Sequence, residues 1–391
     1  MKKGKRVLVA LVSTVVFAIV AIEVLSRVAD GSPDDSTLHK LSFEYLDPAG
    51  ARIKEVRAIP HPYLAYALKP GWRSAPSDPQ RVSHNSLGFR GKETTWKKPP
   101  GVFRIVTLGG SSVYGSSESN DDAVWSQRLE VMLNERYPER KIEVVNCGCY
   151  GYTSFEMLIQ LALRAVNLDP DVVIVYETVN DMRAALYTAG AMTPAIDNTH
   201  WRAVWPVDRP SSLEKQLQKS RTYVFLRRYM TNYVSSRADL GYWTMVNFKS
   251  GSDELYCGNG QGGYPNGVVP REGLDNYRRN LEEMISIAES RGARVFIATQ
   301  ALMEWDLKAK ECPETQLQVF REIQDIQREV AQAHGVALGE TGAAIEAEDA
   351  QHFAATGKHL FLNDVHPTDA GSDLIARTVA AALEQAGVVA D

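Results

Sequence analysis

The chain has 391 residues, of which 44% are hydrophobic and 23% charged, and its formal net charge is −5. These values are typical of a globular protein with one large domain or two modest ones. The sequence has no basic excess, which argues against a nucleic-acid partner, and no acidic block of the kind found in disordered tails.

Residues 1–29 predict a membrane anchor. Four Lys or Arg side chains fall within the first six positions, and an apolar stretch follows from 7 to 25. As a helix this stretch is about 28 Å long, close to the hydrocarbon thickness of a bilayer. The cationic flank favours a cytoplasmic N-terminus, with the rest of the chain on the periplasmic, extracytoplasmic side. A cleaved signal peptide is the alternative, but "SRVADG" is a poor cleavage site, so the uncleaved transmembrane helix is favoured.

Residues 30–101 predict a spacer followed by an extended lead-in. "DGSPDDST" (30–37) is typical of a juxtamembrane spacer, and turn-forming residues recur after it, as in "HNSLGFRG" (84–91). We expect this segment to wrap the following domain rather than to fold alone.

From residue 102 to 391, short β-branched runs alternate with longer amphipathic ones. Candidate strands lie at 103–108, 142–146, 171–177, 294–300 and 336–340. Candidate helices lie at about 122–136, 154–166, 272–291, 314–334 and 368–386. The alternation predicts an α/β domain: a flavodoxin-like three-layer α/β/α sandwich with a mainly parallel five-stranded sheet.

One insertion, at about 186–271, interrupts this pattern. It is rich in Trp and Tyr and contains the helix-like run "SSLEKQLQKSRTYVFLRRYMTNYV". We interpret it as a cap inserted into the 102–391 domain, not as a separate domain.

The four cysteines fit an oxidising compartment. Cys257 and Cys312 are candidates for a disulfide between the insertion and the main body. Cys147 and Cys149 are too close together to bond without strain, so we expect them to be small packed residues. No cysteine pair has zinc-site spacing and no HExxH motif occurs, so we expect neither a metal nor a cofactor.

Small and polar residues follow four of the candidate strands. The segments are "GGSS" (109–112), "NCGCYGYTS" (146–154), "TVND" (178–181) and "FLNDVHPTDAG" (361–371). Ligands of open parallel sheets bind outside the carboxyl ends of the strands, which is where these segments are expected.

In this order, the four segments resemble the conserved blocks of the SGNH branch of the GDSL hydrolases, named for a serine, a glycine, an asparagine and a histidine. The resemblance covers 103–181 and 358–386, and 277–300 also suits it. "HNSLGFRGKE" (84–93) and the anchor look like a membrane-anchored, exported bacterial subgroup.

The resemblance implies that Ser111 is the nucleophile, because it stands third where the family has Gly-Asp-Ser-Leu. Gly110 replaces the aspartate, and Ser112 is the second candidate. A serine on a sharp strand-to-helix turn projects its hydroxyl outward, and nearby backbone N–H groups can face an anion.

The resemblance assigns the oxyanion hole to the backbone amides of Ser111 and Gly151 and to the side chain of Asn180. Such donors stabilise a tetrahedral intermediate, and losing one raises the barrier by roughly 3–4 kcal/mol. Thr178 stands where the family usually has glycine, which is a departure from its pattern.

His366 is implied as the general base, and His359 is a weaker second choice. The family's aspartate lies three residues before the histidine, where this chain has Asn363, whereas Asp364 lies two before it. We favour Asp364 as the third catalytic group, because a carboxylate stabilises imidazolium better. If Asn363 is the partner instead, turnover should be slow.

These residues predict a serine-dependent ester hydrolase. Carboxylesters, including O-acyl groups on carbohydrates, are the implied substrates. One alternative is a polysaccharide O-acetyltransferase that uses the same residues with a sugar hydroxyl as acceptor. The other is a non-catalytic binding protein that kept the fold, since a fold does not guarantee activity.

Overall fold

The computed structural model describes residues 57–186 and 271–389, apart from 60, 62, 65 and 313, together with isolated positions between 13 and 24 and at 220 and 223. The chain divides into two compact units. One comprises Met1–Val56 and Val204–Gly251, and the other comprises Arg57–Ala203 and Ser252–Asp391. The site candidates 109–112, 146–154, 178–181 and 361–371 all belong to the second unit.

Two predictions concern segments that lie mostly outside the described residues. Most of the anchor expected at 7–25 and nearly all of the insertion expected at 186–271 lie outside the described residues, so both stay predictions. Within the described ranges, no helix has both the length and the apolar character needed to cross a membrane.

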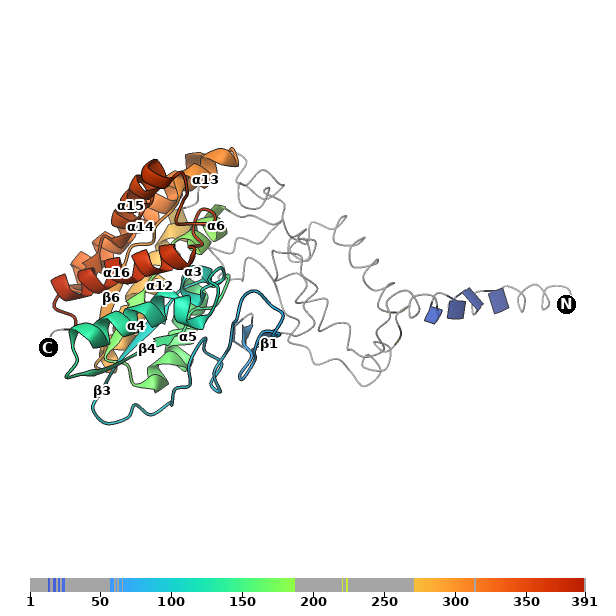
Figure 1. The fold of residues 1–391 in the computed structure, drawn as a ribbon, viewed down its shortest axis with the longest axis horizontal. Helices are drawn as coiled ribbons and strands as arrows, with labels where there is room; N and C mark the ends of the chain where they lie inside the picture. Colours follow the sequence, from blue (N-terminus) through green and yellow to red (C-terminus); the bar gives the residue numbers. More distant parts are fainter. Residues whose placement is uncertain are drawn as a thin grey trace, which may run out of the picture. The chain divides into compact units, whose positions relative to one another are not determined.

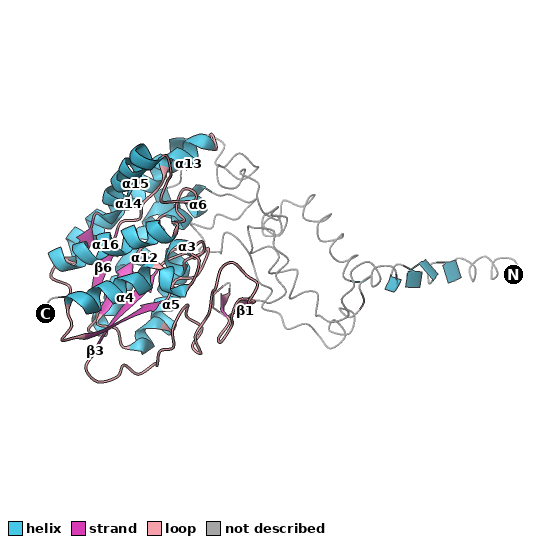
Figure 2. Cartoon of the chain, in the orientation of Figure 1, coloured by secondary structure: helices cyan, strands magenta, loops and turns pink. Residues whose placement is uncertain are grey.

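The second unit is built on a five-stranded sheet (Figures 1 and 2). The strands are β3 (Val102–Leu108), β4 (Lys141–Asn146), β5 (Val172–Val175), β6 (Arg294–Ala298) and β7 (Ala337–Gly339). Their order is β4-β3-β5-β6-β7, and every neighbouring pair is parallel. This confirms the predicted α/β class with a mainly parallel five-stranded sheet, in the strand order of flavodoxin-like folds.

Helices cover both faces of this sheet, which requires its strands to be apolar on both sides. On one face, α4 (Trp125–Arg136) packs against α16 (Asp369–Gln385), and α16 packs against α15 (Thr341–Thr356). On the other face, α5 (Ser154–Leu163) packs against α12 (Arg271–Ser290), and α12 packs against α14 (Glu314–His334) (Figure 1). The central strand β5 reads Val-Val-Ile-Val and is buried throughout, as expected of a strand covered on both sides.

The strand order creates one special place at the carboxyl edge. Because β4 and β5 lie on opposite sides of β3, the chain reverses direction across the sheet at β3. Ligands of such sheets bind at this switch point. The final register pair between β3 and β5 joins Leu108 to Val175, so the segments after both strands leave the sheet side by side.

The lead-in is mostly turns and bends with one small antiparallel pair. Strands β1 (Ala58–Ile59) and β2 (Ala67–Leu68) pair with each other and not with the main sheet. Arg90 bridges to Asn146 at the end of β4, so the lead-in reaches the carboxyl edge of the sheet.

The cysteines divide into two groups. Cys147 and Cys149 are free and buried, and burial raises the pKa of the Cys147 thiol to about 12. Cys312 is disulfide-bonded. Its predicted partner, Cys257, lies outside the described residues, so that pairing stays a prediction.

Candidate active site

Ser111 begins a helix of a single turn shortly after strand β3. Gly109 and Gly110 follow β3, and α3 runs over Ser111–Tyr114. The Tyr114 N–H donates to the Gly110 carbonyl at 2.9 Å, which closes the turn. Ser111 is only 7% exposed, so its hydroxyl lies in a largely dry environment.

The structure brings Ser111 and His366 together. The Ser111 Oγ lies 2.7 Å from Nε2 of His366, although the two residues are 255 positions apart in the sequence. This distance is within hydrogen-bond reach, as required between a nucleophile and its base. His366 lies in the loop between α15 and α16, at the same edge of the sheet as Ser111.

That loop is held by contacts to the nucleophile turn and to the segment after β6. Ser112 Oγ donates to the Val365 carbonyl at 3.2 Å and accepts from Gln300 Nε2 at 3.0 Å. The Met303 N–H donates to the Asp364 carbonyl at 2.7 Å. The second nucleophile candidate, Ser112, is therefore engaged in tying the His366 loop to the sheet.

Asn363, not Asp364, contacts the His366 ring in this structure. Asn363 Nδ2 lies 3.0 Å from His366 Nδ1. The Asp364 carboxylate points elsewhere and forms an ion pair with Arg183, and both side chains are at most 3% exposed. The sequence favoured Asp364 as the group that orients His366. In the structure, the Asp364 carboxylate pairs with Arg183 instead.

Asn180 lies in the first turn of α6 (Val179–Leu186), directly beside the loop that follows β4. Its Nδ2 donates to the Tyr152 carbonyl at 2.8 Å. Gly151, the neighbour of Tyr152, has φ of 76°, in the left-handed region that favours glycine. The structure therefore brings Asn180 and the Gly151 segment together, as an oxyanion hole built from both would require.

His359 has other partners. Its Nδ1 lies 2.7 Å from an Asp349 oxygen, and its ring stacks between Trp305 and Phe353, with both centroid distances 4.1 Å. These contacts commit His359 to packing between α15 and α13 (Glu304–Ala309).

Two side chains of the lead-in form hydrogen bonds with the end of α3. Arg90 Nη1 donates to the Tyr114 carbonyl at 2.9 Å and also to the Gly115 carbonyl. His84 Nε2 lies 3.0 Å from the Tyr114 hydroxyl. The "HNSLGFRG" segment thus positions the turn that carries Ser111, a role that its sequence alone did not indicate.

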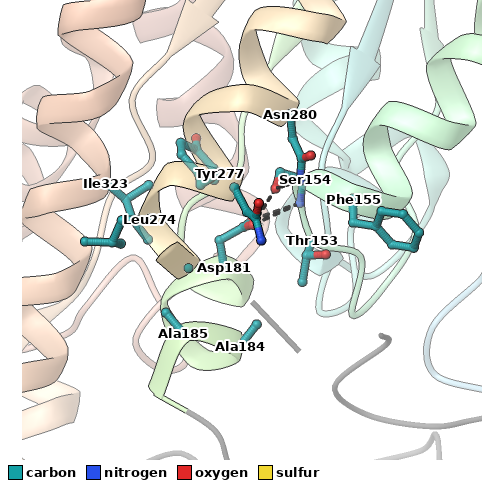
Figure 3. A pocket seen from close by; sticks show the side chains of 12 residues that line it. Thr153, Ser154, Phe155, Asp181, Ala184, Ala185, Leu274, Tyr277, Asn280 and Ile323 are labelled. Carbon is teal, nitrogen blue, oxygen red and sulfur yellow. Dashed lines mark hydrogen bonds between the residues drawn. The ribbon is translucent and has the colours of Figure 1, made fainter. Parts of the chain in front are cut away.

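A small pocket lies beside α6 (Figure 3). It is lined by Asp181, the residue that follows Asn180 in the sequence. The Asp181 carboxylate accepts from the Ser154 N–H at 2.9 Å and from the Ser154 hydroxyl at 2.6 Å (Figure 3). Burial raises the pKa of Asp181 well above its usual value. Because Ser154 begins α5, this contact ties Asn180's helix to the end of the Gly151 loop.

Two further buried polar residues at this edge were missed by the sequence reasoning. Gln300 Oε1 accepts from the N–H groups of Thr178 and Val179 at 2.8 and 2.9 Å. Glu177 accepts from the N–H groups of Gly110 and Asn180. The available signal was a polar residue at the end of an apolar run, which single-sequence patterns cannot distinguish from an ordinary loop.

A serine hydrogen-bonded to a histidine at the carboxyl edge of a parallel α/β sheet is the arrangement of a nucleophilic hydrolase. Residues 107–374 match the model of the GDSL-like lipase/acylhydrolase family, so this chain belongs to that family. It is accordingly a hydrolase that acts on esters, as its resemblance to SGNH proteins predicted.

Several solved structures are similar to this chain. The α/β hydrolase LAE5, from the metagenome of Lake Arreo, is 16% identical, with a TM-score of 0.42 over 72% of this chain and 95% of its own. A catalytic mutant of the acetylxylan esterase Axe2 from Geobacillus stearothermophilus is 16% identical, with a TM-score of 0.41 over 73% and 94%. A GDSL-like lipase from Parabacteroides merdae is 11% identical, with a TM-score of 0.42 over 73% and 96%. No curated protein matches the chain.

Proposed function

We propose that this protein is a serine-dependent ester hydrolase with Ser111 as nucleophile and His366 as general base. The observation that carries the proposal is the 2.7 Å contact between Ser111 Oγ and His366 Nε2. Membership of the GDSL-like lipase/acylhydrolase family supports the same chemistry.

In the first half of the reaction, Ser111 Oγ attacks the acyl carbon of the ester while its proton passes to His366 Nε2. The carbonyl oxygen becomes an oxyanion, which accepts hydrogen bonds from the backbone N–H groups of Ser111 and Gly151 and from Asn180 Nδ2. The bond between the acyl carbon and the alcohol oxygen then breaks, and His366 returns the proton to the leaving alcohol. Water repeats the sequence on the acyl-serine and releases the acid.

We propose O-acyl esters, including O-acyl groups on carbohydrates, as the substrate class. A polysaccharide O-acetyltransferase would use the same residues with a sugar hydroxyl in place of water. The two differ in acceptor, so turnover of an acetyl ester with and without an added oligosaccharide separates them. Free acetate as the main product in both reactions supports the hydrolase, whereas acetylated sugar in excess of acetate favours the transferase.

We also propose that the catalytic unit works on the extracytoplasmic side, held by the N-terminal segment. The disulfide at Cys312 supports an oxidising compartment, and the basic start followed by an apolar stretch supports export. Fractionation of cells should recover the full-length chain with membranes, accessible to an impermeant label. Recovery of the chain from the cytosol with a reduced Cys312 would contradict this proposal.

A fluorophosphonate probe tests the nucleophile without knowledge of the substrate, because it labels activated serines. Wild-type protein should be labelled, Ser111→Ala should not, and His366→Ala should be labelled far more slowly. Ser286→Ala is the matched control, because Ser286 is an exposed residue of α12. Absence of labelling on well-folded wild-type protein would favour the non-catalytic alternative.

A further inference from the structure

Glu177 connects the two halves of the candidate site. It lies two residues after the end of β5 and is 1% exposed. Its Oε2 accepts from the Gly110 N–H at 2.7 Å, and its Oε1 accepts from the Asn180 N–H at 2.8 Å. One carboxylate therefore holds both the turn that presents Ser111 and the helix start that presents Asn180.

Gly110 provides the space for this carboxylate. A Cβ built at Gly110 would lie 2.4 Å from Glu177 Oε2 and 2.2 Å from Asn180 Nδ2, closer than real Cβ contacts allow. The GDSL pattern has aspartate at this position. In this chain, the space beside residue 110 is instead filled by the carboxylate of Glu177, from the segment that follows the neighbouring strand β5.

We propose that Glu177 is a positioning residue for ester hydrolysis, and that its ionised carboxylate substitutes for the aspartate missing at position 110. The inference rests on the proposed function. Ser111 follows β3 and Asn180 follows β5. Their separation therefore depends on the contacts between the two segments that leave these strands. Two charge-assisted hydrogen bonds that one buried carboxylate accepts fix that separation more firmly than neutral bonds would.

Protonation of the Glu177 carboxylate should weaken its hold on the Gly110 and Asn180 N–H groups. The charged and titratable groups facing it are Arg183 and Asp181 of α6, Tyr176 after β5 and Tyr277 of α12. Burial raises the pKa of Glu177 to about 7, although the Asn180 and Gly110 N–H groups and Arg183 oppose this rise. A protonated carboxyl has one oxygen that bears a hydrogen, and this oxygen faces an N–H donor in either orientation.

The experiment measures kcat/KM for an acetyl ester against pH in the wild type and in Glu177→Gln. In the wild type, activity requires that both Glu177 and His366 are deprotonated. Below the pH optimum, kcat/KM should therefore fall with the slope expected for the binding of two protons. Glu177→Gln imitates the protonated state. It should lower kcat roughly ten- to a hundredfold, because small misplacements of catalytic groups cost up to about 10²-fold, and its acid side should fall with one proton.

Two further variants separate positioning from general stability. Glu177→Asp keeps the charge but shortens the reach, so it should lose rate while keeping the two-proton dependence. Glu118→Gln removes another buried carboxylate, one that bonds to Ser372 and not to Gly110 or Asn180. It should lower the melting temperature without changing the shape of the pH profile.

An acid side with the same two-proton slope in Glu177→Gln as in the wild type would overturn the inference. So would equal kcat in the two proteins. Both results leave the proposed function standing if fluorophosphonate still labels Ser111 in the wild type. Failure of that labelling would instead reject the nucleophile assignment itself, so the two failures are distinguishable.

Discussion

The side-chain amide of Asn363 controls which nitrogen of His366 carries the proton. Asn363 Oδ1 accepts from the N–H groups of Val365 and His366 at 3.1 and 2.9 Å, which fixes the amide orientation. Its Nδ2 therefore faces His366 Nδ1 at 3.0 Å. An amide NH₂ only donates, so Nδ1 accepts and the neutral ring carries its proton on Nε2. In that tautomer, Nε2 donates to Ser111, so the ring proton must first move to Nδ1 before Nε2 can accept the Ser111 proton, and turnover should be slow.

Asn363→Asp should therefore activate the enzyme. One carboxylate oxygen can accept the two backbone N–H groups while the other accepts Nδ1–H, which leaves the Nε2 lone pair free for the Ser111 proton. We expect kcat/KM for an acetyl ester to rise roughly 10²–10³-fold, since the opposite replacement in a serine protease triad costs about 10⁴-fold.

Asn167→Asp is the matched control for that experiment, because it adds the same charge at an exposed position. It should leave the rate within about twofold of the wild type. If Asn363→Asp is no faster than the wild type, the tautomer argument is wrong.

Asn180→Ala should lower kcat with little change in KM. The Asn180 amide is proposed to contact the oxyanion, which exists only in the intermediate and its flanking transition states, so its loss should cost about 10²–10³-fold in kcat. Asn134→Ala serves as comparison, because Asn134 bonds to Ile142 at the other end of the sheet. That variant should lose stability and keep kcat. A rise in KM at constant kcat for Asn180→Ala would argue that the amide binds substrate instead.

Removing one partner of the buried ion pair between Arg183 and Asp364 should strongly destabilise the fold. Both side chains are at most 3% exposed, and removing one partner leaves an uncompensated buried charge. Arg183→Met should reduce the free energy of unfolding in urea by about 3–5 kcal/mol, and the double variant with Asp364→Leu should recover much of this loss. Arg271→Met breaks a pair whose arginine is 72% exposed, and should cost at most about 1 kcal/mol. Equal losses in Arg183→Met and Arg271→Met would refute this account.

His84 should make the fold sensitive to acid. Burial lowers the pKa of His84 to about 4, with Arg90 and Arg57 adding to the effect. Because an unfolded histidine has a pKa of about 6.5, the unfolded state binds this proton first, and stability is lost as pH falls from about 6.5 to about 4. The loss attributable to His84 should reach roughly 3 kcal/mol.

The measurement is urea unfolding at several pH values for the wild type and for His84→Gln. The difference between them should shrink as pH falls through that window, because the variant has no such proton to bind. A constant difference between wild type and His84→Gln would exclude this linkage.

Local patterns were sufficient to predict most of the secondary structure. The strand expected at 103–108 is Val102–Leu108, and the helix expected at 314–334 is Glu314–His334. The helix Thr341–Thr356 was not predicted, because it is rich in alanine and buries only a few side chains, so its apolar periodicity is weak. The strand expected at 171–177 ends at Val175, because Glu177 turns away from the sheet to bond to Gly110 and Asn180.

The sequence by itself determined the α/β class and the four polar segments after the strands, because strand periodicity and turn chemistry are local properties. Only the tertiary structure decided which side chains meet. Asn363 and Asp364 are adjacent in the chain, yet one contacts His366 and the other Arg183. Likewise, Gly110 departs from the family pattern for a reason that lies 67 residues away, at Glu177. Such contacts depend on strand order and loop direction, which no local pattern encodes.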